Sequence, residues 1–365
     1  MDKDYQGREK KAVDAIKKAI PLSLKQDMLK ISKGLSCELY ENKEVFPNHL
    51  MGCAIDGVGT KVILAEAMHK YDTIGIDCVA MSANDLATFG KMSPFLFIDC
   101  LSVQDSIQEE ELTGEIIKGV VKGLEECDAS GILRSSIRMN FGKGETASIH
   151  EILSGPKEGY SFDLVGGMIG FIPKKGFNYN LGDSNRIIAL PSSGLHSNGY
   201  TDARLSLLKG DFEEREKYRK RYKGKYSLDG SFDGSTIGRL LLEPTRLYVK
   251  DMAKISKNLD VIGINNTGYG LKNFNRLNGF EFIIDNPMKS QPIFGLIQKE
   301  SGFSDEKMYK TFNMGMGFFV LANKENAEDI LQISKGAEIV GEAKKSEKTR
   351  TVLLKDNKKI VFEGY

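Results

Sequence analysis

The fold class is decided by MGCAIDGVGT (51–60), ILAEAMHK (63–70), TIGIDCVAMSANDLATFG (73–90) and FLFIDCLSV (95–103). Short apolar runs broken by glycine alternate there with segments of helical spacing. This alternation is typical of strands and helices that follow one another along the chain. It predicts an α/β (α+β) fold.

The same kind of pattern extends toward both ends of the chain. Residues 111–129 have apolar positions at helical spacing, and residues 147–153 and 163–172 are strand candidates. The final stretch, RTVLLKDNKKIVFEGY (350–365), predicts a hairpin around a DNKK turn. Residues 8–35 predict one or two peripheral helices.

The length of 365 residues favours two domains over one. The polar, turn-rich segment IPKKGFNYNLGDSN (172–185) contains the predicted boundary, and a second α/β unit begins at RIIALPSSG (186–194). We therefore expect an N-terminal arm over 1–50, a first domain over 51–174 and a second domain over 175–365.

Composition narrows the classes of function. Lys and Arg (51) balance Asp and Glu (50), so the net charge of +1 gives no general attraction for nucleic acid. The five cysteines form no C-x-x-C pair, the N-terminus has no signal-type apolar region, and no apolar run is long enough for a membrane helix. These features predict a soluble cytoplasmic protein without nucleic-acid or membrane partners. The charged stretch 209–234 is interpreted as a solvated surface insertion, with a nucleic-acid patch as the alternative.

The first polar cluster is Asp56-Gly57-Val58-Gly59-Thr60-Lys61, which follows the strand candidate GCAI. Its glycines permit close approach of the backbone to a ligand, and a carboxylate, a hydroxyl and an ammonium flank them. It is not a Walker loop, because G-x-x-x-x-G-K is absent. A strand-to-helix turn closed by a salt bridge is the alternative.

The second cluster comprises Asp77, Asn84 and Asp85 on one predicted helix. Spacings of seven and eight residues place all three on one face, and neighbouring carboxylates suit a magnesium ion with its bound waters. Helix capping by Asp77 with surface exposure of the other two is the alternative.

Two further clusters follow. In Gly142-Lys143-Gly144-Glu145-Thr146, glycine allows close approach while Glu145 and Thr146 offer oxygen atoms; a hairpin turn is the alternative. In Ser192-Ser193-Gly194-Leu195-His196-Ser197-Asn198-Gly199-Tyr200, hydroxyl, imidazole and amide groups gather after a strand, where α/β proteins place ligands. His196 suits an acid, a base or a phosphate ligand.

Seven segments, taken in order, resemble the motif series of the phosphoribosylformylglycinamidine cyclo-ligase family, also called aminoimidazole ribonucleotide synthetases. They are DGVGTK (56–61), GIDCVAMSANDL (75–86), GETA (144–147), SSGLHSNGY (192–200), EPTRLYVK (243–250), TGYG (267–270) and TFNMGMG (311–317). The resemblance covers about residues 52–320.

The resemblance implies a four-stranded N-terminal sheet that pairs with that of a second subunit as an eight-stranded barrel, a C-terminal α/β sandwich domain, and an active cleft between the domains. It implies a homodimer that uses ATP and Mg²⁺, and it leaves K⁺ open as a further cofactor. The implied activity is the ATP-dependent cyclisation of formylglycinamidine ribonucleotide to aminoimidazole ribonucleotide, with release of ADP and phosphate, in purine biosynthesis.

The resemblance also suggests roles for individual residues. The hypothetical catalytic residues are Lys61, His196 and Asn198, and the metal ligands are Asp56, Asp85 and Glu145. The nucleotide would contact Asp56, Gly57, Gly59, Thr60, Lys61, Asn84, Gly144 and Thr146. The substrate would contact Ser193, Gly194, His196, Ser197, Asn198, Thr267 and Gly268.

Three departures from the family pattern keep other readings open. Residues 21–50 contain Gly34 alone in place of a G-G-F-G loop, Asn265 and Tyr269 replace a histidine and a glycine of H-x-T-G-G-G, and Ser148 and His150 replace a second carboxylate and a proline after the GETA segment. The alternatives are a paralogue that phosphorylates a different acceptor and an ATP-binding relative without turnover.

Overall fold

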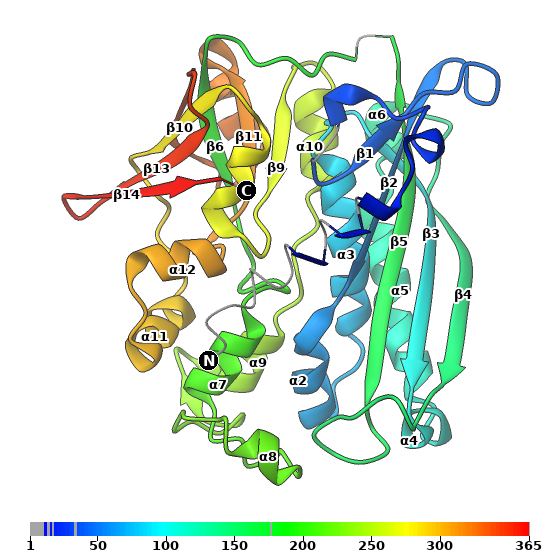
Figure 1. Ribbon diagram of the computed structural model, residues 1–365, viewed down its shortest axis with the longest axis vertical. Helices are drawn as coiled ribbons and strands as arrows, with labels where there is room; N and C mark the ends of the chain where they lie inside the picture. The colour runs from blue at the N-terminus through cyan, green and yellow to red at the C-terminus, as the bar shows by residue number, and fades with distance from the viewer. Residues whose placement is uncertain (1–10, 13–14, 17, 33–34, 176, 365) are drawn as a thin grey trace.

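The computed structural model describes residues 11–12, 15–16, 18–32, 35–175 and 177–364. The chain forms a two-domain mixed α/β structure in which each domain is built on its own sheet (Figure 1). The chain leaves the first sheet at Pro173 and enters the second at Ser184, so the segment between these residues connects the two sheets.

The N-terminal sheet has five strands in the order β1-β2-β5-β3-β4. They are β1 (Glu38–Tyr40), β2 (His49–Gly57), β3 (Ser93–Val103), β4 (Asn140–Ser148) and β5 (Phe162–Pro173). Strands β3 and β4 are parallel and the other pairs are antiparallel. The sheet thus contains four long strands plus the short β1, which comes from the segment predicted as an arm.

Helices cover one face of this sheet. They are α2 (Val62–Ala67), α3 (Ile74–Ala87), α4 (Asp105–Glu109), α5 (Leu112–Cys127) and α6 (Ser130–Leu133), preceded by the 3₁₀ turn η3 (Gly59–Lys61). Gly75 allows α3 to touch α5, because a Cβ there would lie 2.2 Å from the Val120 nitrogen. Helix α3 lies between the sheet and the C-terminal domain (Figure 1).

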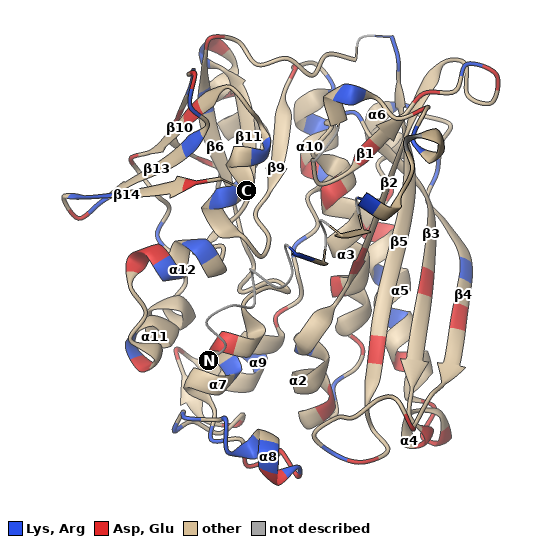
Figure 2. Cartoon of the chain, in the orientation of Figure 1, with Lys and Arg blue, Asp and Glu red and all other residues tan. Residues whose placement is uncertain are grey.

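The opposite face of the N-terminal sheet carries exposed apolar side chains. Side chains alternate along a strand, so Ile55 points away from the helices that Gly52 and Gly166 contact. Ile55 is 75% exposed, and Ile98 on β3 is 43% exposed. Figure 2 shows few charged positions along these strands.

The C-terminal sheet has seven strands in the order β14-β13-β10-β12-β6-β11-β9. They are β6 (Ser184–Pro191), β9 (Ile262–Asn265), β10 (Phe280–Ile284), β11 (Met316–Asn323), β12 (Glu338–Lys345), β13 (Arg350–Lys355) and β14 (Lys358–Glu363). Its helices are α7 (Tyr200–Leu207), α9 (Ile237–Leu242), α10 (Val249–Ser256), η4 (Gly270–Arg276), α11 (Pro292–Ser301), α12 (Asp305–Thr311), η5 (Lys324–Asn326) and α13 (Ala327–Ile333). The predicted terminal hairpin is confirmed, with Asp356 and Asn357 in left-handed conformation at its turn.

The charged stretch 209–234 leaves the sheet as an insertion with α8 (Glu216–Arg219) and the small hairpin of β7 (Ser231–Phe232) and β8 (Ser235–Thr236). Basic residues cluster at α8 (Figure 2). Acidic neighbours pair with several of them, as in Lys220–Glu216 and Lys225–Glu300. The insertion is therefore the mixed-charge surface element that the sequence predicts.

Two local predictions differ from the structure. The strand expected over 147–153 is wrong: β4 ends at Ser148, and the Ile152 and Leu153 N–H groups donate to the Ile149 carbonyl in a turn. The GETA segment instead lies inside β4. Of the helices expected over 8–35, residues 1–10, 13–14, 17 and 33–34 lie outside the described residues, and the rest includes two 3₁₀ turns, η1 (Leu22–Leu24) and η2 (Lys30–Ser32). No helix within the described ranges is long and apolar enough to cross a membrane.

Candidate functional site

A buried ion pair in the N-terminal domain is hydrogen-bonded to the C-terminal domain. The Lys61 Nζ lies 2.8 Å from Asp77 Oδ1, and neither side chain is exposed. Lys61 also donates to the His196 carbonyl at 3.1 Å and to the Glu243 carbonyl at 2.7 Å, both in the C-terminal domain. An ammonium has three donors. All three are therefore used inside the protein.

Asp77 receives hydrogen bonds from the C-terminal domain in return. Its Oδ1 accepts from the Thr245 N–H at 2.8 Å, from Thr245 Oγ1 at 2.6 Å and from Ser197 Oγ at 3.3 Å. Asp77 starts the polar face of α3. The acidic residue of the second motif and the lysine of the first thus anchor the loop that carries His196.

The loop from Ser192 to Gly199 holds His196 in a strained, enclosed position. His196 has a left-handed φ of 62° and is 3% exposed. Its Nε2 accepts the Ser193 N–H at 3.3 Å. Burial lowers the pKa of His196 to about 3, with help from the positive charges of Lys61 and Arg246. The imidazole is therefore neutral near pH 7.

Two glycine-bearing loops of the C-terminal domain, residues 265–270 and 312–317, converge around this histidine loop. Asn313 Nδ2 donates to the Gly194 carbonyl at 2.8 Å, and Asn266 Nδ2 donates to the Met316 carbonyl at 2.7 Å. A Cβ on Gly268 would lie 3.3 Å from Asn198 Oδ1. The structure thus gathers the predicted substrate-contact residues of this domain, which are Ser193, Gly194, His196, Ser197, Asn198, Thr267 and Gly268.

Asp85 faces the C-terminal domain from the last turns of α3. Its Oδ1 accepts from Asn265 Nδ2 at 2.8 Å. Burial raises the pKa of Asp85 to about 7; the Asn265 hydrogen bond and the Arg276 charge oppose this rise, and the Asp56 charge adds to it. The Asp56 carboxylate is therefore near enough to act on the charge of Asp85.

Other residues of the nucleotide hypothesis lie in the same region. Asn84 donates to the Arg246 carbonyl at 2.9 Å and accepts the Tyr248 N–H at 2.8 Å, so it ties α3 to the EPTRLYVK segment. Gly59 has a left-handed φ of 70°, which residues with a side chain rarely adopt. Thr60 Oγ1 lies 3.4 Å from Thr201 Oγ1 across the junction.

The third motif is not brought into this cluster. Gly144 pairs with Asp99 in the parallel β3–β4 ladder, and a Cβ on Gly144 would lie 2.6 Å from Asp99 Oδ1. Alternation along the strand points Glu145 to the other face of the sheet, where its nearest ionic partner is Lys143 at 3.9 Å. Thr146 lies on the same exposed edge strand.

The predicted metal trio of Asp56, Asp85 and Glu145 is consequently not assembled in this protomer. Within the described residues, no three His, Cys, Asp or Glu side chains are grouped so that they could hold a metal ion. The physical reason is the two-residue period of β4, which sends Glu145 away from the helix layer.

Sequence reasoning missed Asp99. This side chain is 9% exposed, and burial raises its pKa to about 6. Its Oδ2 has no hydrogen-bond partner in the described structure. Asp99 pairs with Gly166 on β5, which in turn pairs with Asp56 on β2, so one row of the sheet carries both carboxylates. The sequence did contain an indication of this buried carboxylate, because Asp99 is the one charged residue inside the apolar run FLFIDCLSV.

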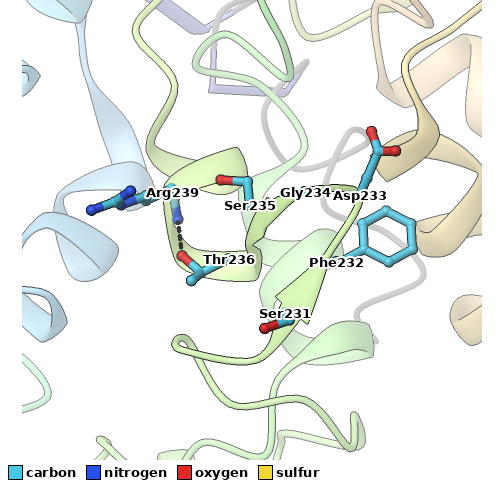
Figure 3. A pocket seen from close by; sticks show the side chains of 7 residues that line it. All are labelled: Ser231, Phe232, Asp233, Gly234, Ser235, Thr236 and Arg239. Carbon is cyan, nitrogen blue, oxygen red and sulfur yellow. Dashed lines mark hydrogen bonds between the residues drawn. The ribbon is translucent and has the colours of Figure 1, made fainter.

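A hollow of about 450 Å³ lies on the charged insertion and is lined by Ser231–Thr236 and Arg239 (Figure 3). Arg239 points away from the other lining side chains in this view, and its backbone N–H is capped by Thr236 Oγ1. None of the predicted site residues lines this hollow.

Similar folds occur among solved structures. The structure of AaThiL complexed with AMPPCP and TMP matches with a TM-score of 0.56 at 15% identity, over 97% of this chain and 94% of that chain. Hydrogenase maturation protein HypE in complex with ATP matches with a TM-score of 0.53 at 12% identity, over 85% of this chain and 84% of that chain. E. coli HypE matches with a TM-score of 0.54 at 12% identity, over 86% of this chain and 85% of that chain. These likenesses establish the fold.

Sequence comparisons go further. Residues 41–172 match the N-terminal domain, and residues 182–353 the C-terminal domain, of the AIR synthase related protein family. A phosphoribosylformylglycinamidine cyclo-ligase of Methanosarcina mazei is 35% identical over 81% of this chain and 80% of the relative. Those of Pyrococcus furiosus and Pyrococcus horikoshii are 35% and 34% identical, over 79% and 88% of this chain and 76% and 87% of the relatives. The chain therefore belongs to the AIR synthase related family and is an enzyme of the ligase type.

Proposed function

We propose that the protein catalyses the ATP-dependent cyclisation of formylglycinamidine ribonucleotide to aminoimidazole ribonucleotide, with release of ADP and phosphate, as a step of purine biosynthesis. The observation that carries the proposal is the meeting of motif residues from both domains around Lys61, Asp77 and His196. Relatives named for this activity match four-fifths of the chain.

The proposed reaction has two parts. ATP transfers its γ-phosphoryl group to the formyl amide oxygen of the substrate, which turns a poor leaving group into phosphate. The neighbouring amine then attacks the activated carbon, the imidazole ring closes, and phosphate departs. Phosphoryl transfer depends mainly on positioning and on neutralisation of charge around the transferred group.

Asp56 and Asp85 fit a magnesium ion in this scheme. Magnesium is commonly held by one or two carboxylates while it keeps several waters and contacts substrate phosphates. The charge of Asp56 helps to raise the pKa of Asp85, and a divalent cation between two such carboxylates relieves this repulsion. The ion would neutralise phosphate charge during transfer. Glu145 can join such a site only if a second copy of the chain brings it there.

We assign binding roles to the loops around the junction. Gly59 and Thr60 offer backbone and hydroxyl groups to the nucleotide beside Asp56. Gly57 lets the nucleotide approach the backbone while its N–H donates to Asp56 Oδ1, and Asn84 orders the backbone at Arg246. Gly144 and Thr146, like Glu145, can contact the nucleotide only if a second copy of the chain brings them to this site. His196 and Asn198 orient the substrate, and the low pKa of His196 fits a neutral hydrogen-bonding imidazole better than a proton carrier.

The exposed apolar face of the N-terminal sheet supports a homodimer. Ile55, Phe95 and Ile98 are 37–75% exposed on this face. An apolar sheet face normally packs against another layer. A second copy whose sheet covers this face would complete the proposed eight-stranded barrel.

The decisive experiment is an assay with purified protein, formylglycinamidine ribonucleotide, ATP and Mg²⁺, run with and without K⁺. The proposal expects ADP release coupled to formation of the aminoimidazole, and the K⁺ arm tests the need for that ion. Asn265 and Tyr269, which stand where the family pattern has histidine and glycine, favour a paralogue with another acceptor as the second candidate. ADP release only with other acceptors would establish that candidate, and no ATP binding by calorimetry would remove both.

A further inference from the structure

Segment 244–248 crosses between helix α3 and loop 192–199, and it is hydrogen-bonded to both. It connects α9 to α10 and forms the centre of the EPTRLYVK motif. On the side of α3, Asn84 Nδ2 donates to the Arg246 carbonyl at 2.9 Å, and Asn84 Oδ1 accepts the Tyr248 N–H at 2.8 Å. One side chain of the helix therefore fixes the backbone of the segment on both sides of its central residue.

Side chains of the same segment hold the start of the loop. Arg246 Nη1 donates to the Pro191 carbonyl at 3.0 Å, and the Tyr248 hydroxyl donates to the same oxygen at 2.9 Å. Ser193 Oγ donates in the other direction, to the Pro244 carbonyl at 2.5 Å. Pro191 is the last residue of β6, so its carbonyl marks the point at which the chain leaves the sheet to form the loop. Two donors on one carbonyl occupy both of its lone pairs and fix the direction in which the chain continues.

Arg246 is itself held by helix α10. Its Nη2 donates to Asp251 Oδ2 at 2.8 Å, and Ser334 Oγ donates to Asp251 Oδ1 at 3.3 Å. The guanidinium carbon of Arg246 also lies 5.2 Å from the centroid of the Tyr248 ring. A guanidinium is a rigid planar fork, so its two hydrogen bonds fix the Pro191 carbonyl relative to Asp251.

The same segment packs beside His196. The ring centroids of Tyr248 and His196 are 6.1 Å apart. A Cβ on Gly317 would lie 2.0 Å from the Tyr248 hydroxyl and 2.5 Å from His196 Cε1, so both rings pack against one bare backbone position. The positive charge of Arg246 adds to the effects of burial and of Lys61 in lowering the pKa of His196. Arg246 is therefore placed to affect both the path of the loop and the surroundings of its imidazole.

We infer that Arg246 is a positioning residue, which holds loop 192–199 in the conformation that receives the substrate and links this loop to the nucleotide side of the site through Asn84. The identity of the two ligands rests on the proposed function. Asn84 bonds to the backbone of Arg246 while the Arg246 side chain bonds to Pro191, so an ordering of α3 by the nucleotide also orders the loop. Nucleotide and substrate then favour the same arrangement, and each strengthens the binding of the other.

The competing role for Arg246 is that of an ordinary ion-pair partner of Asp251, with side chains 28% and 18% exposed. Loss of such a pair would lower the stability of the fold without changing how loop 192–199 responds to the nucleotide. Loss of a positioning residue would loosen this loop selectively and uncouple it from α3. The response of the loop to the nucleotide therefore separates the two roles.

Hydrogen exchange of the full-length protein, followed by mass spectrometry, measures the loop directly. Wild type is compared with Arg246→Ala and with Arg186→Ala, the matched control, whose arginine side chain is 32% exposed and pairs with Glu342. We expect the peptide over 192–199 to exchange at least about tenfold faster in Arg246→Ala, because a hydrogen bond from a charged donor that opposes local opening is lost. Arg186→Ala should match wild type. A methylene-bridged ATP analogue with Mg²⁺ should slow exchange of this peptide in wild type but not in Arg246→Ala.

Two further variants separate position from charge. Arg246→Lys keeps a positive charge for Asp251 but lacks the fork that also reaches Pro191, so it should recover most of the thermal stability while the loop stays loose. Tyr248→Phe removes the second donor to the Pro191 carbonyl and keeps the ring. Because both donors act on one acceptor, the effects of Arg246→Ala and Tyr248→Phe on exchange of the loop should not be additive.

Calorimetry connects the loop to the substrate. Affinity is measured for the ATP analogue with Mg²⁺, and for formylglycinamidine ribonucleotide with and without that analogue. Arg246→Ala should bind the analogue within about threefold of wild type but the ribonucleotide at least about tenfold more weakly, the scale of one hydrogen bond from a charged donor. The analogue should strengthen binding of the ribonucleotide in wild type and in Arg186→Ala, and should no longer do so in Arg246→Ala.

Circular dichroism and thermal melting report whether each variant folds, and Arg246→Lys and Tyr248→Phe carry the test if Arg246→Ala does not. Unchanged exchange of loop 192–199 in the variants would overturn the inference, as would faster exchange spread evenly over the C-terminal domain. A wild-type loop that does not respond to the ATP analogue would also overturn it. Wild type whose loop responds but which fails to cyclise formylglycinamidine ribonucleotide would overturn the proposed function alone, because the exchange experiment needs no acceptor.

Discussion

The Lys61 ammonium lies 2.8 Å from the Asp77 carboxylate, with both side chains closed off from solvent. Each partner also bonds to the C-terminal domain, Lys61 to backbone carbonyls and Asp77 to Thr245 and Ser197. A buried pair of this kind adds little stability over apolar packing, but losing one partner is expensive. The pair therefore serves to hold the two domains in one relative position.

We expect Lys61→Met to reduce the free energy of unfolding by about 3–5 kcal/mol, because Asp77 would remain charged in the interior. Urea denaturation followed by circular dichroism measures the change. Lys70→Met is the matched control, since Lys70 pairs with Asp72 at 45% and 47% side-chain exposure. That variant should lose less than about 1 kcal/mol. Similar stability of the two variants would mean that the buried pair does not join the domains.

Asp85→Asn should lower turnover at least about tenfold, since an amide cannot replace a carboxylate as a magnesium ligand. Stability should change little. In the wild type Asn265 Nδ2 lies 2.8 Å from Asp85 Oδ1, and the asparagine side chain still offers an oxygen to it. Steady-state assays over a range of Mg²⁺ concentrations measure the effect. Asp183→Asn, at a side chain 85% exposed, is the control. Unchanged turnover in Asp85→Asn would remove this residue from the proposed metal site.

Glu66 gives a pH dependence with a definite sign. This side chain is 4% exposed and accepts the Lys157 N–H, and burial raises its pKa to about 7 from 4.5. A carboxyl whose pKa is raised by folding stabilises the fold fully below its unfolded pKa, and this contribution is lost as the pH rises toward 7.

We therefore expect Glu66→Gln to remove part of the stability loss that wild type shows between pH 4.5 and 7. At pH 8 the variant should be more stable by about 1–3 kcal/mol, the order that such a shift allows. Denaturation at several pH values measures the difference. Glu115→Gln, at an exposed side chain paired with Lys118, should follow wild type at every pH. A Glu66→Gln variant that is no more stable than wild type at pH 8 would show that the buried carboxylate carries no such cost.

Gly317→Ala should displace His196. An added Cβ would lie 2.0 Å from the Tyr248 hydroxyl and 2.5 Å from His196 Cε1, so both contacts have to be relieved by a shift of these buried rings. We expect a cost of about 1–3 kcal/mol in stability from overpacking, together with a loss of turnover larger than that of any surface variant. Gly295→Ala provides the control, since nothing lies within 4 Å of its added Cβ. Full activity of Gly317→Ala would argue against a substrate-orienting role for His196.

Ile98→Asp should convert the proposed dimer to a monomer, because it places a charge on the exposed apolar face where Ile98 is 43% exposed. Light scattering coupled to gel filtration measures the mass. Ile152→Asp, at a turn residue that is 79% exposed, should leave the mass unchanged. A monomeric wild-type protein would contradict the proposal outright, and with it any role for Glu145 supplied by a second copy.

Much of the fold was already evident in the local pattern. The helices α3 and α5, the strand β6 and the terminal hairpin follow from apolar spacing and turn residues, which depend only on neighbours a few positions away. The resemblance of seven ordered motifs also led to the family that the comparisons establish. The strand expected over 147–153 failed because apolar residues in a turn imitate a strand when their partner is unknown.

The sequence by itself determined which residue types and turns stand at the ends of the strands, and hence the fold class and the family. Only the tertiary structure decided what those residues do. Lys61 reaches the carbonyl of Glu243, 182 positions away, and Asp85 meets Asn265, 180 positions away, whereas Glu145 points to the far face of its sheet. The physical reason is that a side chain's conformation and charge state depend on whatever is packed against it, and these partners are adjacent in space but remote along the chain.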